Sequence, residues 1–161
     1  MDISKRHAMR KNDLKDMKEN LRQHVGDNVD NLFKSGAELI QTETNVLYAE
    51  KKEIIAFQFE DKILPSLRAL NNNLVSLPSV TVDMGAIRFV TNGADIMAPG
   101  ITKVTEGIQK GDFVMIIDEK FGKALAIGQL LCDGNEIKSM NKGKVIRNIH
   151  YVNDELWNLK L

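Results

Sequence analysis

The chain has 161 residues, of which 43% are hydrophobic and 27% are charged, and 22 basic residues balance 22 acidic ones. This length suits one ordinary domain or two small ones, and the composition is typical of a folded globular protein. The zero net charge argues against a strongly basic nucleic-acid binder. No apolar run reaches the roughly 18 residues of a membrane span, and the charged N-terminus is unlike a signal peptide. We therefore expect a cytoplasmic protein with no membrane partner.

The charge is nevertheless unevenly distributed. Residues 1–27 carry seven Lys or Arg against five Asp or Glu, and residues 120–161 carry seven against four. Residues 79–119, in contrast, carry three against six. If both ends folded onto one face, a neutral protein would still have a local positive field. Solvated charge without any partner is the alternative interpretation.

The first predicted elements are a polar edge strand over residues 5–9 and a helix over about 12–25. Apolar residues recur at helical spacing, at Leu14, Met17, Leu21 and Val25. Asn12 is the expected N-cap, and Gly26 follows the last apolar residue, where a left-handed conformation ends many helices.

Three strands are predicted next, over residues 37–42, 46–48 and 54–59, with Lys51 and Lys52 at a hairpin tip. Pro65 suits the first turn of a following helix. The triplet Asn71–Asn73 ends this helix, and Pro78 follows. This polar stretch is the predicted boundary between two domains, 1–76 and 77–161.

The second half is rich in strand patterns. Residues 80–101 contain a β-branched run, one helical turn, an Asn-Gly break and an apolar run that ends in Pro-Gly. Apolar strands over 113–117 and 124–131 flank Gly122 as a hairpin, and 144–150 alternates as a last strand. Several short strands with glycine-marked turns indicate a small barrel. The expected fold class is α+β: an N-terminal α+β domain followed by a mostly-β pseudo-barrel.

Residues that carry chemistry are sparse. The histidines His7, His24 and His150 lie far apart without a recognisable partner, so no metal site is expected. Cys132 ends an apolar strand as an inert thiol, and it is the only cysteine, which excludes an internal disulfide. There is no phosphate loop and no dinucleotide fingerprint. Nothing specifies a catalytic residue or a cofactor, so we do not expect an enzyme.

Three stretches carry a family resemblance: VDMGAIRFVTNGADIMAPGI (82–101), MNKGKVIRNIHYVNDELWNLK (140–160) and FEDKILPSLRALNN (59–72). The first two resemble the beginning and end of a PUA domain of the malignant-T-cell-amplified-sequence family and of the ligatin-type initiation factor. The third resembles the end of the pre-PUA domain that precedes it in that family. The resemblance implies a pre-PUA domain over 1–76, a PUA domain over 77–161, and RNA binding without catalysis.

PUA domains present RNA to the short first helix, the following glycine loop and the last strand. Carried over to this sequence, the implied RNA-binding residues are Gly85, Ala86, Arg88, Asn92, Gly93, Ala94, Met97, Pro99, Gly100, Lys142, Lys144, Arg147 and His150. Free backbone amides at the helix start and in the glycine loop would meet phosphates. Gly93 and Gly100 could equally serve only to allow tight turns. Arg88 and Arg147 are the strongest candidates.

Other residues of these stretches are expected to have structural roles. We expect Phe89 to belong to the core, and Asp83 and Asp95 to organise turns by capping backbone amides. Trp157 is expected to pack over the end of the barrel.

The implied partners are structured RNA, either ribosomal RNA or tRNA, and not DNA. The small ribosomal subunit and a protein with an initiation-factor-one-like domain are further implied partners. Two alternatives stay open: an accessory subunit of a tRNA- or rRNA-modifying enzyme, and an interaction module that has lost RNA binding.

Overall fold

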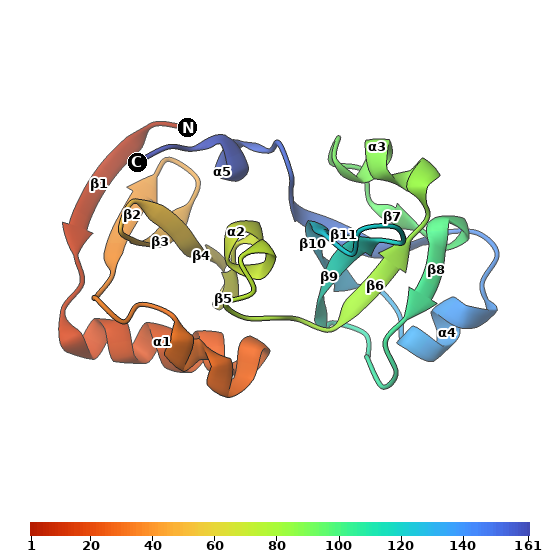
Figure 1. Cartoon of the computed structure of the whole chain (residues 1–161), viewed down its shortest axis with the longest axis horizontal. Coiled ribbons are helices and arrows are strands. Elements are labelled where there is room, and N and C mark those ends of the chain that lie inside the picture. Colours follow the sequence, from red (N-terminus) through yellow and green to blue (C-terminus); the bar gives the residue numbers. More distant parts are fainter. The chain divides into compact units, whose positions relative to one another are not determined.

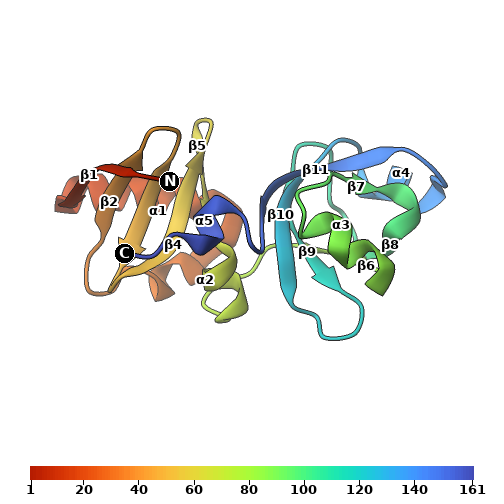
Figure 2. The same cartoon turned by 90° about the horizontal axis from the view of Figure 1, so that it is seen from above.

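A computed structural model describes all residues of the chain, 1–161. They form two compact units, which we call the N-terminal unit (Met1–Ser76 with Leu159–Leu161) and the C-terminal unit (Leu77–Asn158; Figures 1 and 2). Each unit contains one β-sheet and several helices, so the predicted α+β fold class is confirmed. No helix in either unit is long and apolar enough to cross a membrane.

The N-terminal unit contains a five-stranded antiparallel sheet whose strands follow one another in chain order. The strands are β1 (Ile3–Ala8), β2 (Glu38–Thr42), β3 (Val46–Glu50), β4 (Glu53–Phe59) and β5 (Lys62–Pro65). The four strands predicted here are confirmed, whereas β5 was not predicted. Lys51 and Lys52 connect β3 to β4 with φ values of 50° and 67°. Two consecutive left-handed residues match the twist of an antiparallel hairpin, which explains this tight turn.

Helix α1 (Lys11–Val25) begins one residue earlier than predicted, and a 3₁₀ helix, η1 (Gly26–Asn31), follows it. Arg10 occupies the N-cap position without a side-chain cap, so the prediction of Asn12 as N-cap is wrong. Gly26 ends α1 with a φ of 67°, as predicted. The predicted apolar stripe is largely confirmed, because α1 buries Met17, Leu21 and Val25.

The side chain of Asn20 joins α1 to the sheet. Its amide donates to the carbonyl of Asp61, and its oxygen accepts from the N–H of Ile63 at 2.9 Å. Both partners belong to the β4–β5 hairpin, and α1 packs against β5. One amide side chain therefore fixes the register of the helix against the edge of the sheet.

Pro65 does not begin a helix, contrary to the prediction. It ends β5, an edge strand that tolerates the missing N–H of proline. Ser66 is the N-cap of α2 (Leu67–Asn71), and its hydroxyl accepts from the N–H of Ala69 and donates to the carbonyl of Ile54 at 2.7 Å. A small hydroxyl side chain satisfies the free amides of a first turn, which proline cannot do.

The C-terminal unit contains a six-stranded sheet in the order β7-β11-β10-β9-β6-β8. The strands are β6 (Ser79–Val82), β7 (Ile96–Met97), β8 (Ile101–Val104), β9 (Phe113–Asp118), β10 (Ala124–Leu130) and β11 (Lys144–Tyr151). Only β6 and β9 pair in parallel. The hairpin of β9 and β10 and the last strand are confirmed as predicted. β8 was not predicted.

The connection between β7 and β8 shows why this sheet closes. These strands are the two edges of the sheet, yet only the three residues of η3 (Ala98–Gly100) separate them. Strands about 4.8 Å apart would place the edges of a flat six-stranded sheet roughly 24 Å apart. The four residue steps from Met97, the end of β7, to Ile101, the start of β8, span at most about 14 Å. The sheet must therefore curl until its edges approach, which gives the predicted pseudo-barrel.

Short helices lie against the barrel, namely η2 (Met84–Ala86), α3 (Ile87–Val90) and α4 (Gly134–Ser139), and α5 (Glu155–Asn158) follows β11. Apolar residues from every strand of the sheet and from α3 and α4 fill the interior, among them Val82, Val90, Ile96, Val104, Ile116, Ala126, Ile137 and Ile146. The core thus fixes the positions of η2, α3, β7 and η3, the elements that build the candidate site.

Candidate nucleic-acid interface

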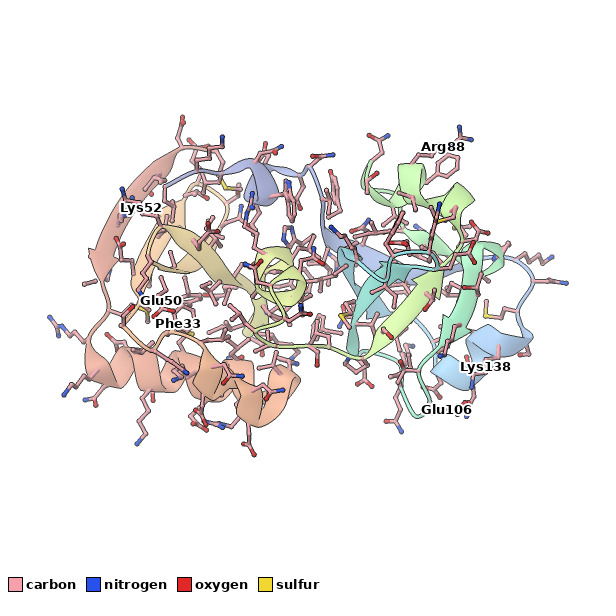
Figure 3. The ribbon with its side chains drawn as sticks, viewed as in Figure 1. Phe33, Glu50, Lys52, Arg88, Glu106 and Lys138 are labelled. Carbon is pink, nitrogen blue, oxygen red and sulfur yellow. The ribbon has the colours of Figure 1, made fainter.

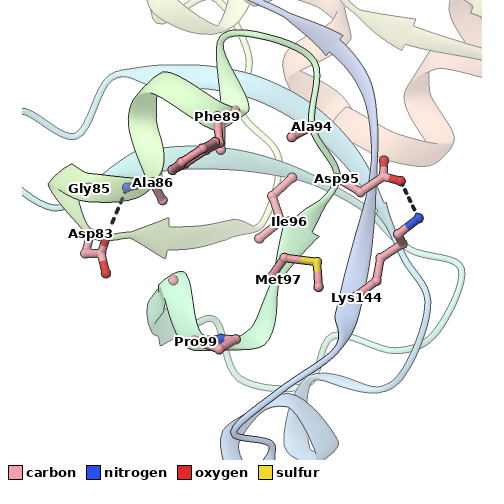
Figure 4. Close-up of a pocket in the computed structure, with 12 residues that line it drawn as sticks. Asp83, Gly85, Ala86, Phe89, Ala94, Asp95, Ile96, Met97, Pro99 and Lys144 are labelled. Atoms are coloured by element: carbon pink, nitrogen blue, oxygen red, sulfur yellow. Dashed lines mark hydrogen bonds and ion pairs between the residues drawn. The ribbon is translucent and has the colours of Figure 1, made fainter.

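A groove of about 690 Å³ opens on the C-terminal unit between η2, α3, β7, η3 and β11 (Figure 4). Its lining residues are Asp83, Gly85, Ala86, Phe89, Val90, Ala94, Asp95, Ile96, Met97, Pro99, Gly100 and Lys144. Most of them are apolar or glycine. The three charged side chains are two carboxylates and one ammonium group. The groove is therefore a site for an apolar or aromatic group more than for a bare anion.

One wall of the groove depends on Asp83. Its carboxylate accepts from the N–H of Ala86 at 2.9 Å, which caps η2 and confirms the predicted role of this aspartate. The N–H of Asp83 donates to the carbonyl of Gly100, so η2 and η3 lie side by side. A Cβ at Gly100 would lie 3.3 Å from the Cβ of Ala86. This close approach explains the glycine at position 100.

Asp95 and Lys144 form an ion pair on the opposite wall. The Nζ of Lys144 lies 2.9 Å from the Oδ2 of Asp95, and the other carboxylate oxygen accepts from the N–H of Asn148 at 2.8 Å. Partial burial alone would raise the pKa of Asp95, but the Asn148 N–H and the Lys144 ammonium outweigh it, so this pKa lies below its ordinary value. Asp95 therefore stays ionised and ties β7 to β11, rather than organising a turn of its own as predicted.

The mouth of the groove is apolar and exposed. The Phe89 side chain is 54% exposed and that of Met97 is 48% exposed, and both border the opening in Figure 4. The prediction that Phe89 belongs to the core is wrong, because the single turn of α3 directs Val90 inward instead. A four-residue helix with three apolar side chains cannot bury all of them on one face, and that was the sequence signal for Phe89.

The Arg88 guanidinium lies 4.7 Å from the centre of the Phe89 ring, a cation–π distance. Its side chain projects from α3 into solvent in Figure 3. An exposed aromatic ring and a cation therefore stand together at the rim of the groove.

Several of the backbone amides that were predicted to meet phosphates have partners within the chain. The N–H of Met84 donates to Glu119, and that of Ala86 donates to Asp83. In the glycine loop, the N–H groups of Asn92, Gly93 and Ala94 donate to carbonyls of α3. These five N–H groups are therefore bonded within the chain.

The structure brings seven of the thirteen predicted site residues together in the groove: Gly85, Ala86, Ala94, Met97, Pro99, Gly100 and Lys144. Arg88, Asn92, Lys142 and Arg147 are exposed outside it. Gly93 has a φ of 89°, and a Cβ there would lie 2.9 Å from the Tyr151 ring. Gly93 therefore shapes the loop, which matches the alternative interpretation for this residue.

His150 does not belong to the surface. It is 2% exposed, and its Nδ1 lies 2.7 Å from the Oδ2 of Asp154. Asp154 also accepts from the N–H groups of Tyr151 and Trp157, so it organises the start of α5. The expectation that His150 lacks a partner is wrong. A buried ring does not reach RNA, and we therefore remove His150 from the candidate interface.

A metal site needs several acidic, histidine or cysteine side chains in a suitable arrangement. No group of three or more His, Cys, Asp or Glu side chains is arranged to hold a metal ion. The half-buried Cys132 thiol has a raised pKa, first because of burial and then because of the nearby carboxylates of Glu136 and Asp133. A raised pKa keeps the thiol protonated and weakly nucleophilic.

Comparison with known proteins agrees with this geometry. Residues 78–152 match the PUA domain family. An uncharacterized protein of Methanocaldococcus jannaschii is 41% identical over 162 residues, which cover 99% of each chain. Translation machinery-associated protein 20 of Saccharomyces cerevisiae is 41% identical over 146 residues, 85% of this chain and 81% of that protein. A hypothetical protein from Pyrococcus horikoshii has a solved structure that superposes with a TM-score of 0.82 at 33% identity, covering 95% of this chain and 98% of that one.

The barrel and its groove thus define a PUA-domain protein. The chain belongs to the family of translation machinery-associated protein 20 and the malignant T-cell-amplified sequence proteins. The resemblance identified from the sequence is confirmed.

Proposed function

We propose that this chain is a non-catalytic RNA-binding protein that acts with the translation machinery and binds structured RNA through the groove of its C-terminal unit. The observation that carries the proposal is the groove itself, where the exposed ring of Phe89 and the exposed thioether of Met97 occur together with the Arg88 guanidinium over that ring. RNA-binding proteins recognise unpaired bases by stacking and hydrogen-bond their edges, and they hold phosphates with Arg and Lys.

The distribution of charge determines how RNA would lie. Asp83 and Asp95 line the groove, so a phosphate inside it would be repelled. Arg88, Lys142 and Arg147 are exposed outside it, where phosphates meet no lining carboxylate. We therefore place an unpaired base against Phe89 and Met97, with the sugar-phosphate backbone along the rim. This arrangement favours an unpaired stretch of a structured RNA over a continuous helix.

Membership of this family supports a proposal for the partners and for the role of each unit. Because yeast translation machinery-associated protein 20 is similar over most of its length, we place the RNA in the ribosome or in tRNA bound there. Residues 77–161 would form the RNA-binding domain, and residues 1–76 would contact the small subunit or an initiation-factor-one-like protein. Neither role involves catalysis.

The test measures binding of small ribosomal subunits and of tRNA to the purified chain over a salt series. The double variant Arg88→Glu/Arg147→Glu is compared with a control of equal charge change, Lys110→Glu/Lys138→Glu. Figure 3 places Lys138 and Arg88 at opposite ends of the C-terminal unit. We expect the first variant to lose most binding and the control to keep it. Each lost phosphate contact should also reduce the slope of log K against log salt by about one.

Equal binding by both variants would contradict the site. Binding of wild type that does not change with salt would contradict the phosphate contacts, because counterion release makes such binding salt-dependent. If the chain instead isolated with an RNA-modifying enzyme and not with ribosomal subunits, the accessory-subunit alternative would replace the proposal.

A further inference from the structure

The turn between β9 and β10, residues 119–123, exposes a phenylalanine that the proposed groove does not use. Phe121 is 67% exposed, more than Phe89 or any other exposed large hydrophobic side chain of the protein. Its neighbours Lys120 and Lys123 are exposed as well. An aromatic ring exposed to water between two lysines contributes little to folding, so stability does not explain its presence.

The backbone of this turn is held firmly. Asp118 is 4% exposed, and its carboxylate accepts from the N–H groups of Lys120, Phe121 and Lys123. Burial alone would raise the pKa of Asp118, but these backbone donors outweigh it and the pKa is lowered, so the carboxylate stays ionised. Gly122 takes a φ of 67° within the same turn. Phe121 is therefore presented from a fixed position, which reduces the entropy lost when a ligand binds.

The side chains of the turn match single-stranded RNA. The Nζ of Lys120 lies 5.2 Å from the centre of the Phe121 ring. Proteins that bind single strands combine aromatic rings, on which bases stack, with cations that follow the backbone. Phe121 supplies the ring, and Lys120 and Lys123 supply two cations beside it.

The turn is also joined to the groove. The N–H of Glu119 donates to the carbonyl of Val82 at 3.1 Å, and a Glu119 carboxylate oxygen accepts from the N–H of Met84 at 3.3 Å. Met84 begins η2, and the next two residues of η2 line the groove. Met84 thus links the turn to the groove through its backbone N–H, and its side chain is exposed.

We propose that the β9–β10 turn is a second RNA contact, where Phe121 stacks on an unpaired base of the strand that leaves the groove and Lys120 and Lys123 hold its phosphates. This inference rests on the proposed function of the groove. It extends the RNA-binding surface past η2 to elements outside the predicted site.

The experiment uses the full chain and two fluorescein-labelled RNA hairpins, one with ten-nucleotide single-stranded tails at both ends and one with two-nucleotide tails. Fluorescence anisotropy gives the dissociation constants at fixed salt. Phe121→Ala should weaken binding of the long-tailed hairpin about tenfold, a typical loss for one base stacked on an aromatic ring. The same change should leave the short-tailed hairpin within twofold of wild type. Phe121→Trp should keep wild-type affinity for both.

A groove variant separates this inference from the function on which it rests. Met97→Glu should weaken both hairpins, because it places a negative charge at the mouth of the groove. If Met97→Glu weakens both hairpins while Phe121→Ala changes neither, the turn is not an RNA contact and the groove proposal stands. An equal loss of both hairpins in Phe121→Ala also overturns the inference, because the turn would then act on the groove. If wild type binds neither hairpin, the proposed function and the inference fail together.

Discussion

The carboxylate of Asp95 and the ammonium of Lys144 meet at 2.9 Å on one wall of the groove, so the one cation that lines the groove is already paired. Asp95 also receives the N–H of Asn148, which an amide oxygen could accept equally well. Replacing Asp95 by asparagine would therefore change the charge of the groove and keep the hydrogen bond from the Asn148 N–H.

Asp95→Asn should raise RNA affinity several-fold, because it removes a negative charge from the groove and releases Lys144 to interact with the RNA. An exposed ion pair contributes only about 0.2–1 kcal/mol, so the free energy of unfolding should change little. Glu106→Gln is the matched control, since it releases Lys138 from a similar pair. Fluorescence anisotropy with tRNA measures both variants. Weaker binding by Asp95→Asn would mean that Asp95 contacts the RNA itself.

Phe89→Ala should lower RNA affinity about tenfold, the range expected for loss of one stacked base, and should leave the thermal midpoint almost unchanged. The reason is that the Phe89 ring is 54% exposed and contributes little to the core. Ile3→Ala, which trims an exposed apolar side chain in the N-terminal unit, is the control and should bind as wild type does. A large loss of stability in Phe89→Ala would show that Phe89 has the structural role predicted from the sequence.

Gly93→Ala should destabilise the C-terminal unit more than Gly107→Ala. Both glycines have positive φ, 89° and 81°, so each variant loses about 1–2 kcal/mol through left-handed strain. A Cβ at Gly107 meets open space, whereas a Cβ at Gly93 would lie 2.9 Å from the Tyr151 ring. We expect this contact to lower the free energy of unfolding by about 1–3 kcal/mol more.

The single tryptophan, Trp157, lies in the C-terminal unit, so its fluorescence in urea reports on this comparison. Equal midpoints for the two glycine variants would show that Tyr151 moves aside without loss.

Asp154→Asn should destabilise the C-terminal unit by about 1–3 kcal/mol at neutral pH, because the amide replaces a carboxylate that accepts from His150 and two backbone N–H groups. Burial alone would raise the pKa of Asp154, but these partners lower it below its ordinary value of 3.8. A lowered pKa in the folded state contributes stability that is present above the ordinary value and is lost as the pH falls below it.

Urea midpoints at pH 7 and pH 3 test this dependence. Acidification should reduce the difference between wild type and Asp154→Asn. A difference of the same size at both pH values would mean that the charge of Asp154 does not contribute.

Several secondary-structure elements were predictable from the local sequence pattern. The strands of the second half were predicted because β-branched and apolar residues recur between glycines, and the hairpin of β9 and β10 followed directly. β8 (Ile101–Val104) was missed because two of its four side chains are exposed and polar, so it has no apolar run. β5 was missed because Pro65 looked like the start of a helix, although an edge strand accepts proline.

Some features of the candidate site were likewise predictable from the sequence, and others were not. Seven predicted residues meet in the groove because glycines and small residues let η2 and η3 approach each other. Phe89 and His150 were assigned to the wrong environments. Whether a side chain faces the core depends on the direction of a one-turn helix or on a partner four residues away, and neither is fixed by hydrophobicity alone.

The sequence by itself determined the fold class, the family and the segments that build the site, because these follow from local periodicity, turn residues and a recognisable motif. Only the tertiary structure decided that the sheet closes through η3, that the N–H of Met84 is bonded to Glu119, and that Lys144 of the groove is paired with Asp95. These properties depend on contacts between residues far apart in the chain, such as Asp95 with Lys144 and Glu119 with Met84. A contact of that kind exists only when the folded core has placed both residues.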